Sequence, residues 1–124
     1  MKTALVLDDQ GAYVRALVRS LRGELEITGA ETIAAARAAL QPGMVVALVD
    51  ICLSTTDAAN REGLEFIHWL RSERPDIRII AMSAQDEPDI PEQAKMAGAD
   101  VFLSKPLRIS ELKAELARLT GDGP

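Results

Sequence analysis

Short apolar runs alternate with helical periodicity along the whole chain. The first run, Ala4–Leu7, precedes a stretch in which Val14, Leu17, Val18 and Leu21 recur at spacings of three and four residues. This spacing places the four side chains on one face of a helix, whereas a short unbroken apolar run is typical of a buried strand. The pattern therefore predicts a strand and then an amphipathic helix at the start of the chain.

The same alternation continues, and we predict five strands, at Ala4–Leu7, Leu25–Thr28, Met44–Val49, Arg78–Met82 and Val101–Leu103. The later helices are marked by apolar residues at helical spacing: Ile33, Ala36 and Leu40; Leu64, Ile67 and Leu70; Ile90, Ala94 and Ala97; Ile109, Leu112, Leu116 and Leu119. Continuous apolar runs suit strands that are buried on both faces of a parallel sheet. Repeated β–α units predict an α/β fold with helices on both faces and right-handed crossovers.

The length of 124 residues fits one domain. We expect that domain over residues 1–120 and a short C-terminal tail over residues 121–124, where glycine and proline gather. Aromatic residues make up only 3% of the chain, so the core must be built from Ala, Val, Leu and Ile.

The net charge and the single cysteine limit the kinds of partner and the compartment that we expect. A formal net charge of -5 argues against direct binding of nucleic acid, whose phosphates are bound by Lys/Arg patches. No apolar run approaches the length of a membrane span, and the N-terminus lacks the features of a signal peptide. Cys52 is the only cysteine, so an internal disulfide is impossible and a reducing compartment is favoured. We therefore expect a cytoplasmic protein with no direct nucleic-acid or membrane partner.

Polar side chains follow four of the predicted strands at the point where each strand ends. Asp8 and Asp9 follow the first strand, Asp50 the third, Ser83 the fourth and Lys105 the fifth. The carboxyl ends of parallel strands meet at one edge of the sheet, where ligands bind in open α/β folds. We therefore expect these side chains to converge.

Three neighbouring carboxylates repel one another and resist joint ionisation. A hard divalent cation relieves this repulsion, and carboxylate oxygens suit Mg²⁺. A carboxylate beside such a cation can attack an activated phosphoryl group. Lys105 offers positive charge, and Ser83 a hydroxyl donor, to the phosphoryl oxygens. The residues thus favour Mg²⁺-dependent phosphoryl transfer.

In these features the chain resembles, over essentially its full length, the receiver domain of two-component response regulators. The matching pieces are Val6–Asp9, Val49–Ile51, Met82–Ala84, Gly98–Asp100 and Leu103–Pro106. Each piece is weak alone, but their order and spacing together are specific. The resemblance implies a flavodoxin-like, doubly wound fold, with a single five-stranded parallel sheet in the order 2-1-3-4-5 and five helices on both faces.

The resemblance also implies a role for each residue of the cluster. Asp50 is expected to be the phosphoacceptor. Asp8, Asp9 and Asp50 are expected to hold Mg²⁺ together with the backbone carbonyl of Cys52.

Three further residues complete the implied set. Ser83 is expected to be the switch hydroxyl that moves toward the new phosphoryl group. Lys105 is expected to supply the cation and to precede Pro106 in a cis bond, so that Asp50, Ser83 and Lys105 form the catalytic set. Phe102 falls at the family's aromatic switch position, although a packed core aromatic would satisfy the pattern equally.

The implied function is a phosphorylation-dependent signalling switch. Asp50 would take a phosphoryl group from a sensor histidine kinase or a histidine phosphotransfer protein, and the domain would hydrolyse its own acyl phosphate. The signal would pass to a downstream effector protein or to an output domain absent from this sequence. Conventional turnover of a small molecule is not expected.

Two departures from the family pattern stand beside the predicted site. The segment between Asp50 and Gly63 is several residues longer than the family usually has, and the extra residues fall in Ser54–Glu62. Cys52 replaces a polar residue that is common two places after the phosphoacceptor. Because Cys52 and Gln85 are expected to flank the path of the attacking water, the departure bears on the lifetime of the phosphorylated state.

Two other functions stay open at this point. The chain could be a receiver-like interaction adaptor with a vestigial pocket, a reading that only the long Ser54–Glu62 segment favours. It could also be a metal-dependent phosphohydrolase with an aspartate nucleophile. Such enzymes place a second acid two residues after the nucleophile, whereas Gln10 occupies that position after Asp8.

Overall fold

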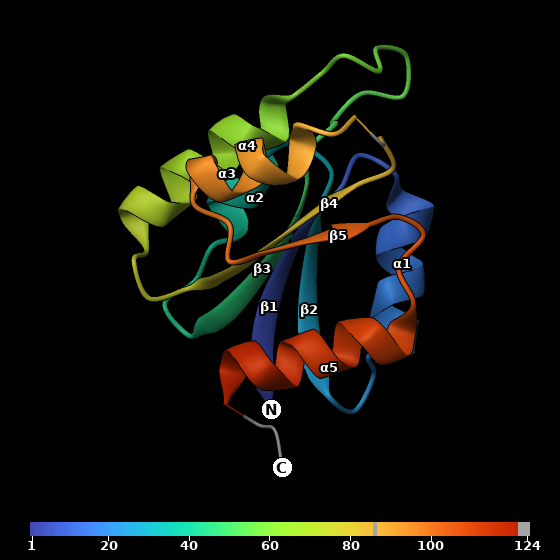
Figure 1. Cartoon of the computed structure of the whole chain (residues 1–124). Helices are drawn as coiled ribbons and strands as arrows, with labels where there is room; N and C mark the ends of the chain where they lie inside the picture. Colours follow the sequence, from blue (N-terminus) through green and yellow to red (C-terminus); the bar gives the residue numbers. More distant parts are fainter. Residues whose placement is uncertain (86, 122–124) are drawn as a thin grey trace.

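Five parallel strands form one sheet in the order β2-β1-β3-β4-β5. The computed structural model describes residues 1–85 and 87–121. The strands are β1 (Lys2–Leu7), β2 (Leu25–Ala30), β3 (Met44–Asp50), β4 (Arg78–Ser83) and β5 (Val101–Ser104). This order confirms the predicted doubly wound α/β fold, and Figure 1 shows the strands running side by side.

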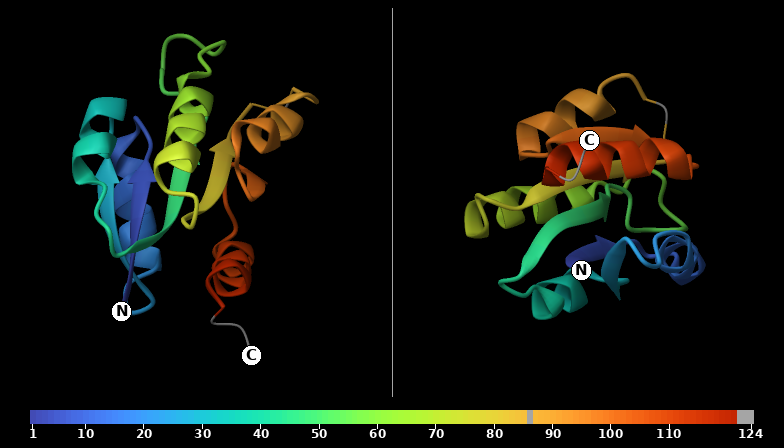
Figure 2. Two further views of the ribbon diagram at one scale, coloured as in Figure 1. Left: turned by 90° about the vertical axis from the view of Figure 1, so that its left-hand side faces the viewer. Right: turned by 90° about the horizontal axis from the view of Figure 1, so that it is seen from below.

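In the described ranges, four helices connect successive strands, a fifth follows β5, and together they cover both faces of the sheet. They are α1 (Gly11–Ser20), α2 (Ile33–Ala39), α3 (Glu62–Glu73), α4 (Ile90–Ala97) and α5 (Ile109–Thr120). Buried residues of α1 and α5 pack on one face, and those of α2, α3 and α4 pack on the other. Figure 2 shows these two helix layers on either side of the sheet.

The central strand β3 explains why its sequence is apolar without interruption. Successive side chains of a strand point to opposite faces, so Ala47 and Val49 join the core under α2, α3 and α4. Val46 and Leu48 join the core under α1 and α5. Both faces of β3 are therefore covered by helices, and six of its seven residues are buried.

The predicted strand boundaries were short by one or two residues. Strand β2 runs past Gly29 to Ala30, because these residues continue the register with Val6 and Leu7 of β1. The polar residues that were expected to follow β3 and β4 are the last residues of those strands. Backbone pairing therefore extends to the carboxyl edge of the sheet, at Asp50 and Met82.

Elements of secondary structure occur throughout residues 2–120. Helix α5 is followed by Gly121, whose φ of 76° is the left-handed conformation that favours glycine after a helix. The rest of the predicted tail, residues 122–124, lies outside the described residues. In the described ranges, every helix is too short or too polar to cross a membrane.

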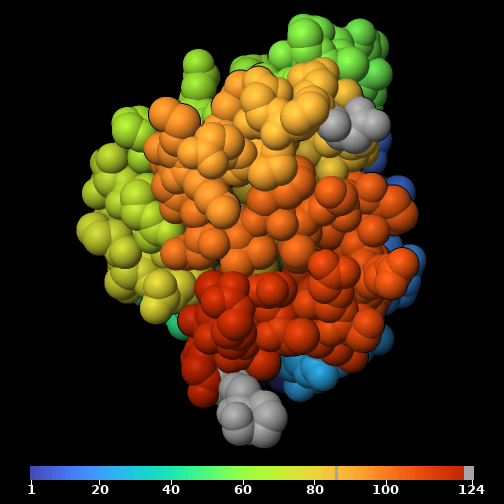
Figure 3. Space-filling view, in the orientation of Figure 1, coloured from blue at the N-terminus to red at the C-terminus, as the bar shows by residue number. Residues whose placement is uncertain are grey.

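The loop between β3 and α3 extends beyond the carboxyl edge of the sheet (Figure 1). Figure 3 shows the face built by α4, β5 and α5, with this loop at its upper rim. The helix that follows the loop passes very close to the end of β3. Its Gly63 donates its backbone N–H to the carbonyl oxygen of Ile51 at 2.9 Å.

Gly63 is required by this close approach. A methyl group added at Gly63 would lie 2.1 Å from the carbonyl oxygen of Asp50 and 2.6 Å from Cα of Ile51. Both are backbone atoms, so relief of the clash needs α3 to move away from the sheet next to Asp50. The sequence pattern marked Gly63 only as the end of the long segment.

We expect Gly63→Ala to lower the free energy of unfolding by about 3 kcal/mol, because this overlap outweighs the gain of about 1 kcal/mol that alanine brings to a helix. Urea unfolding measures the change. Gly43→Ala is the matched control, since an added methyl there meets nothing within 4 Å. Equal stabilities of the two variants would contradict the proposed clash.

Candidate functional site

Three carboxylates converge at the carboxyl edge of the sheet. Asp8 and Asp9 follow β1, and Asp50 ends β3; each offers an oxygen, and these oxygens lie within 4.8 Å of one another. Asp8 is 0% exposed and Asp50 is 5% exposed. The backbone holds both: Gln10 donates its N–H to Oδ1 of Asp8 at 2.9 Å, and Cys52 donates its N–H to Oδ1 of Asp50 at 3.3 Å.

The Lys105 side chain bridges two of these carboxylates. Its ammonium Nζ lies 2.5 Å from Oδ2 of Asp8 and 3.0 Å from Oδ2 of Asp50. The bond to Pro106 is cis, as predicted. The backbone N–H of Lys105 donates to the carbonyl oxygen of Ser83 at 2.9 Å, so the end of β4 helps to position this lysine.

The charges of the cluster are unbalanced. Burial, which is the largest cause, and the Asp8 charge together raise the pKa of Asp50 to about 6, although Lys105 acts in the opposite direction. Burial and Asp8 likewise raise the pKa of Asp9. Burial lowers the pKa of Lys105, but its hydrogen bond to Asp8 and the charge of Asp50 outweigh burial and raise it. One lysine therefore leaves excess negative charge, which a divalent cation would relieve.

The donor set fits a hard divalent cation. Carboxylate oxygens are the ligands that such cations prefer, and the cluster opens onto a pocket of about 100 Å³. The pocket is lined by Asp9, Gln10, Asp50, Cys52, Ser54, Ala84, Gln85 and Lys105. This volume admits small ligands only.

The two predicted switch residues lie outside the pocket lining. Ser83 is fully buried at the end of β4, and its hydroxyl oxygen accepts the N–H of Gln85 at 2.9 Å. Phe102, on β5, is half-buried and packs against the core under α2, α3 and α4. The structure thus brings together Asp8, Asp9, Asp50 and Lys105, with Ser83 on the adjacent strand end and Phe102 one strand farther away.

The family model of the response regulator receiver domain matches residues 4–117. The chain belongs to this family. KdpE of Escherichia coli, the KDP operon transcriptional regulatory protein, is 33% identical over 120 residues, covering 94% of this chain and 50% of KdpE. The probable transcriptional regulatory protein TcrX of Mycobacterium tuberculosis is 33% identical over 122 residues, covering 94% of this chain and 49% of TcrX. The receiver domain thus spans about half the length of these curated relatives.

Solved structures of receiver domains share the fold. The BeF3-activated DrrB receiver domain has a TM-score of 0.86 at 19% identity, with 98% of each chain covered. A response regulator protein from Burkholderia pseudomallei has a TM-score of 0.79 at 29% identity, with coverage of 96% of this chain and 66% of that chain. That structure contains a phosphorylated aspartic acid and a calcium ion.

The long segment of this receiver domain is held by its own side chains. Ser54 accepts the N–H groups of Thr56 and Asp57 on its hydroxyl oxygen, at 3.2 and 3.0 Å. Oδ1 of Asn60 accepts the N–H groups of Leu53 and Glu62, both at 3.0 Å. Ser54 also lines the pocket, so the ordered loop shapes one side of it.

Arg61 joins this loop to the segment before α4. Its guanidinium donates to the carbonyl oxygens of Ala58 and Asn60 at 2.9 and 3.0 Å and forms an ion pair with Glu87. The predicted segment ended at Glu62, whereas that residue is the first of α3. The Cys52 thiol faces the same loop, with Sγ 3.4 Å from the carbonyl oxygen of Ser54 and 3.5 Å from that of Asp57.

Sequence reasoning missed Tyr13 in the first turn of α1. The Lys105 ammonium lies 4.4 Å from the centroid of the Tyr13 ring. The Tyr13 hydroxyl oxygen accepts the backbone N–H of Leu107 at 3.4 Å. The available signal was position alone, since a residue in the first turn of a helix after Asp9 lies near the same edge of the sheet.

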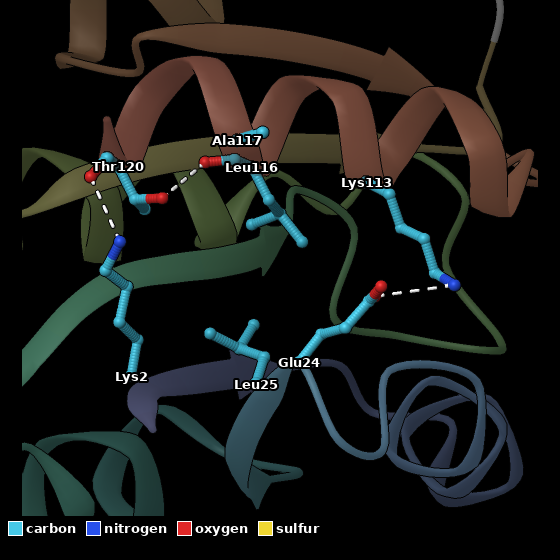
Figure 4. Close-up of a pocket in the computed structure, with 7 residues that line it drawn as sticks. All are labelled: Lys2, Glu24, Leu25, Lys113, Leu116, Ala117 and Thr120. Atoms are coloured by element: carbon cyan, nitrogen blue, oxygen red, sulfur yellow. Dashed lines mark hydrogen bonds and ion pairs between the residues drawn. The ribbon is translucent and has the colours of Figure 1, made fainter. Parts of the chain in front are cut away.

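A larger pocket of about 280 Å³ lies beside α5 and the starts of β1 and β2, far from the carboxylates (Figure 4). Lys2 donates from Nζ to the carbonyl oxygen of Thr120 at 3.2 Å, and Lys113 pairs with Glu24 at 3.4 Å. These contacts link α5 to the start of the sheet. The titratable groups converge at the other edge of the sheet, and chemistry rather than volume identifies a functional site.

The raised pKa of Asp50 predicts a pH-dependent stability. The folded chain holds the Asp50 proton up to a pKa of about 6, while the unfolded chain releases it near 3.8, so folding takes up a proton between these values. The stabilising effect of this proton is fully present below 3.8 and is lost as the pH rises through about 6. Asp50→Asn removes this dependence, because asparagine does not ionise.

We expect the wild type to lose stability relative to Asp50→Asn as the pH rises, in the absence of divalent cations. The difference between their free energies of unfolding should grow by about 2 kcal/mol between about pH 4 and pH 7. Urea unfolding over this range measures the difference. Asp76→Asn is the control, and for it the same difference in free energy should change in the opposite direction with pH. The reason is that a hydrogen bond from Arg74 lowers the pKa of the exposed Asp76. A flat difference for Asp50→Asn would show that its carboxyl group is not destabilised by folding.

Proposed function

We propose that this receiver domain accepts a phosphoryl group on Asp50 and acts as a phosphorylation-dependent signalling switch. The observation that carries the proposal is the buried Asp50 carboxylate, with a lysine ammonium 3.0 Å from its Oδ2 and two further carboxylates beside it. The relative from Burkholderia pseudomallei, which contains a phosphorylated aspartic acid, supports the same chemistry here.

Transfer requires Asp50 to be ionised when the donor arrives. One of its carboxylate oxygens attacks phosphorus, a P–O bond forms, and the donor's P–O bond (acyl phosphate) or P–N bond (phosphohistidine) breaks as the donor takes the electron pair. Lys105 keeps its proton and faces the developing negative charge, because its ammonium is within hydrogen-bond distance of Asp50. Ser83, on the neighbouring strand end, is proposed to donate its hydroxyl to the new phosphoryl group.

We propose Mg²⁺ as the cation. Asp8, Asp9 and Asp50 would hold it, together with the backbone carbonyl of Cys52, which borders the same pocket. When bound, Mg²⁺ neutralises negative charge on the transferring phosphoryl oxygens. The excess of carboxylates over lysine supports this choice.

Loss of the phosphoryl group needs water on the open side of the pocket. Cys52 and Gln85 line that pocket, and we propose that they flank the water that hydrolyses the acyl phosphate. The Cys52 thiol lies near two carbonyl oxygens of the loop, so its S–H group points toward the loop rather than toward the water.

The proposed partners follow from the donor chemistry. A sensor histidine kinase or a histidine phosphotransfer protein would supply the phosphoryl group, and the α4–β5–α5 face in Figure 3 would pass the signal to an effector protein or output domain. Ser83 and Phe102 are proposed to couple the site to that face. We infer that transfer takes place in the cytoplasm, which the single unpaired cysteine favours.

Acetyl phosphate with Mg²⁺ should add one phosphoryl group to the wild-type protein, as measured by intact mass. Asp50→Asn should stay unlabelled, because it lacks the accepting oxygen. Omission of Mg²⁺ should also prevent labelling. Asp76→Asn is the matched control and should be labelled like the wild type, since this aspartate is exposed and remote from the carboxylate cluster.

Labelling that persists in Asp50→Asn would mean that another residue is the acceptor. A wild-type protein that binds Mg²⁺ yet takes no label would instead favour the interaction adaptor. Turnover of a small phosphate ester without a protein adduct would favour the phosphohydrolase.

Mg²⁺ should also stabilise the folded protein. At ten times its Kd the cation contributes about 1.4 kcal/mol to the free energy of unfolding, which raises the melting temperature by about 5 °C. Asp9→Asn should lose most of this shift, because it removes one of the three carboxylates. Potassium chloride at equal ionic strength controls for screening, and an unchanged Mg²⁺ shift in Asp9→Asn would remove Asp9 from the proposed ligand set.

A further inference from the structure

Tyr13 makes two contacts with the segment that carries Lys105. The ring of Tyr13 lies on one side of the Lys105 ammonium, at 4.4 Å from Nζ to the centroid. The hydroxyl oxygen of the same side chain accepts the N–H of Leu107, two residues farther along the chain, at 3.4 Å. One residue of α1 therefore contacts both the lysine head and the backbone that follows it.

The ring completes the surroundings of the ammonium. An ammonium group has three N–H donors, and Asp8 and Asp50 accept from Nζ of Lys105. In the described parts of the chain these two carboxylates are its hydrogen-bond acceptors, and the aromatic face is its third close neighbour. Lys105 is only 9% exposed, so the cation–π attraction acts where water screens it little.

The same contact gains importance when Asp50 is modified. A lysine head is a point charge on a flexible four-carbon stem, and one of its two acceptors is the Asp50 carboxylate that would take the phosphoryl group. Transfer therefore changes the acceptor on that side. The Tyr13 ring and the backbone N–H of Leu107 belong to other residues, and the transfer does not alter them chemically.

We propose that Tyr13 is a positioning residue, whose ring holds the Lys105 ammonium at the carboxylates in the geometry needed for phosphoryl transfer. The inference rests on the proposed function, since it concerns the rate at which Asp50 is labelled. The ring is the essential part, and the hydroxyl adds the weaker anchor at Leu107.

The rate of labelling by acetyl phosphate and Mg²⁺ tests the proposal. Tyr13→Leu keeps much of the apolar bulk but loses the aromatic face, and labelling should slow about tenfold. Tyr13→Phe keeps the face and should stay within about threefold of the wild type, because it loses only the weaker anchor. The matched control is Trp69→Leu, which removes a ring that contacts Arg37 at 4.8 Å in a different part of the molecule. Trp69→Leu should label at the wild-type rate.

Proton NMR of the Lys105 side chain separates positioning from general loss of structure. The ε-methylene protons of Lys105 should show an upfield ring-current shift in the wild type, in Tyr13→Phe and in Trp69→Leu. Tyr13→Leu should lose it while keeping its melting temperature within a few degrees of Trp69→Leu.

Each result decides one question. A wild type that takes no label refutes the proposed function, whatever Tyr13 does. A labelled wild type with Tyr13→Leu equally fast refutes only the role of Tyr13. Equal slowing of Tyr13→Phe and Tyr13→Leu would also overturn the assignment to the ring, since the hydroxyl would then be the essential group.

Discussion

The site depends on one buried ionic contact, between the Lys105 ammonium and the carboxylates of Asp8 and Asp50. Buried charges are tolerated only when they are paired and hydrogen-bonded, and here the pairing joins the ends of β1 and β3 to the segment after β5. The charges do not cancel, because one lysine ammonium faces three carboxylates. A fully neutral cluster would be a structural ion pair with no affinity for a further cation. The surplus of negative charge would favour the binding of a further cation at this edge of the sheet.

The sheet makes this contact possible. Three of its parallel strands deliver residues far apart in sequence to one edge, and the pairing of β3 and β4 continues to Asp50 and Met82, next to the site. The carboxyl halves of β1 and β3 are buried on both faces, so core packing fixes the ends of these two strands. Regular structure positions the charged groups, and the loops around them shape access.

The sequence allowed the fold and the four converging charged residues to be predicted, because both follow from where apolar runs stop. Asp50 stands directly after such a run and Lys105 two residues after another. The carboxyl ends of parallel strands lie at one edge of the sheet, so these residues are brought together. Gly63 and Tyr13 could not be found in this way. The need for glycine at residue 63 arises from how closely α3 passes the backbone of β3, and the contact of Tyr13 arises from where α1 lies relative to residue 105. Both are distances between separate elements, which no local pattern contains.

The internal bonds of the loop between β3 and α3 have a thermodynamic consequence. A loop that is disordered when free must lose conformational entropy when it contacts a protein, and this loss weakens association. Here the side chains of Ser54, Asn60 and Arg61 already fix the backbone. The loop beside the pocket is thus preorganised, so a protein that contacted it would bind with little loss of conformational entropy.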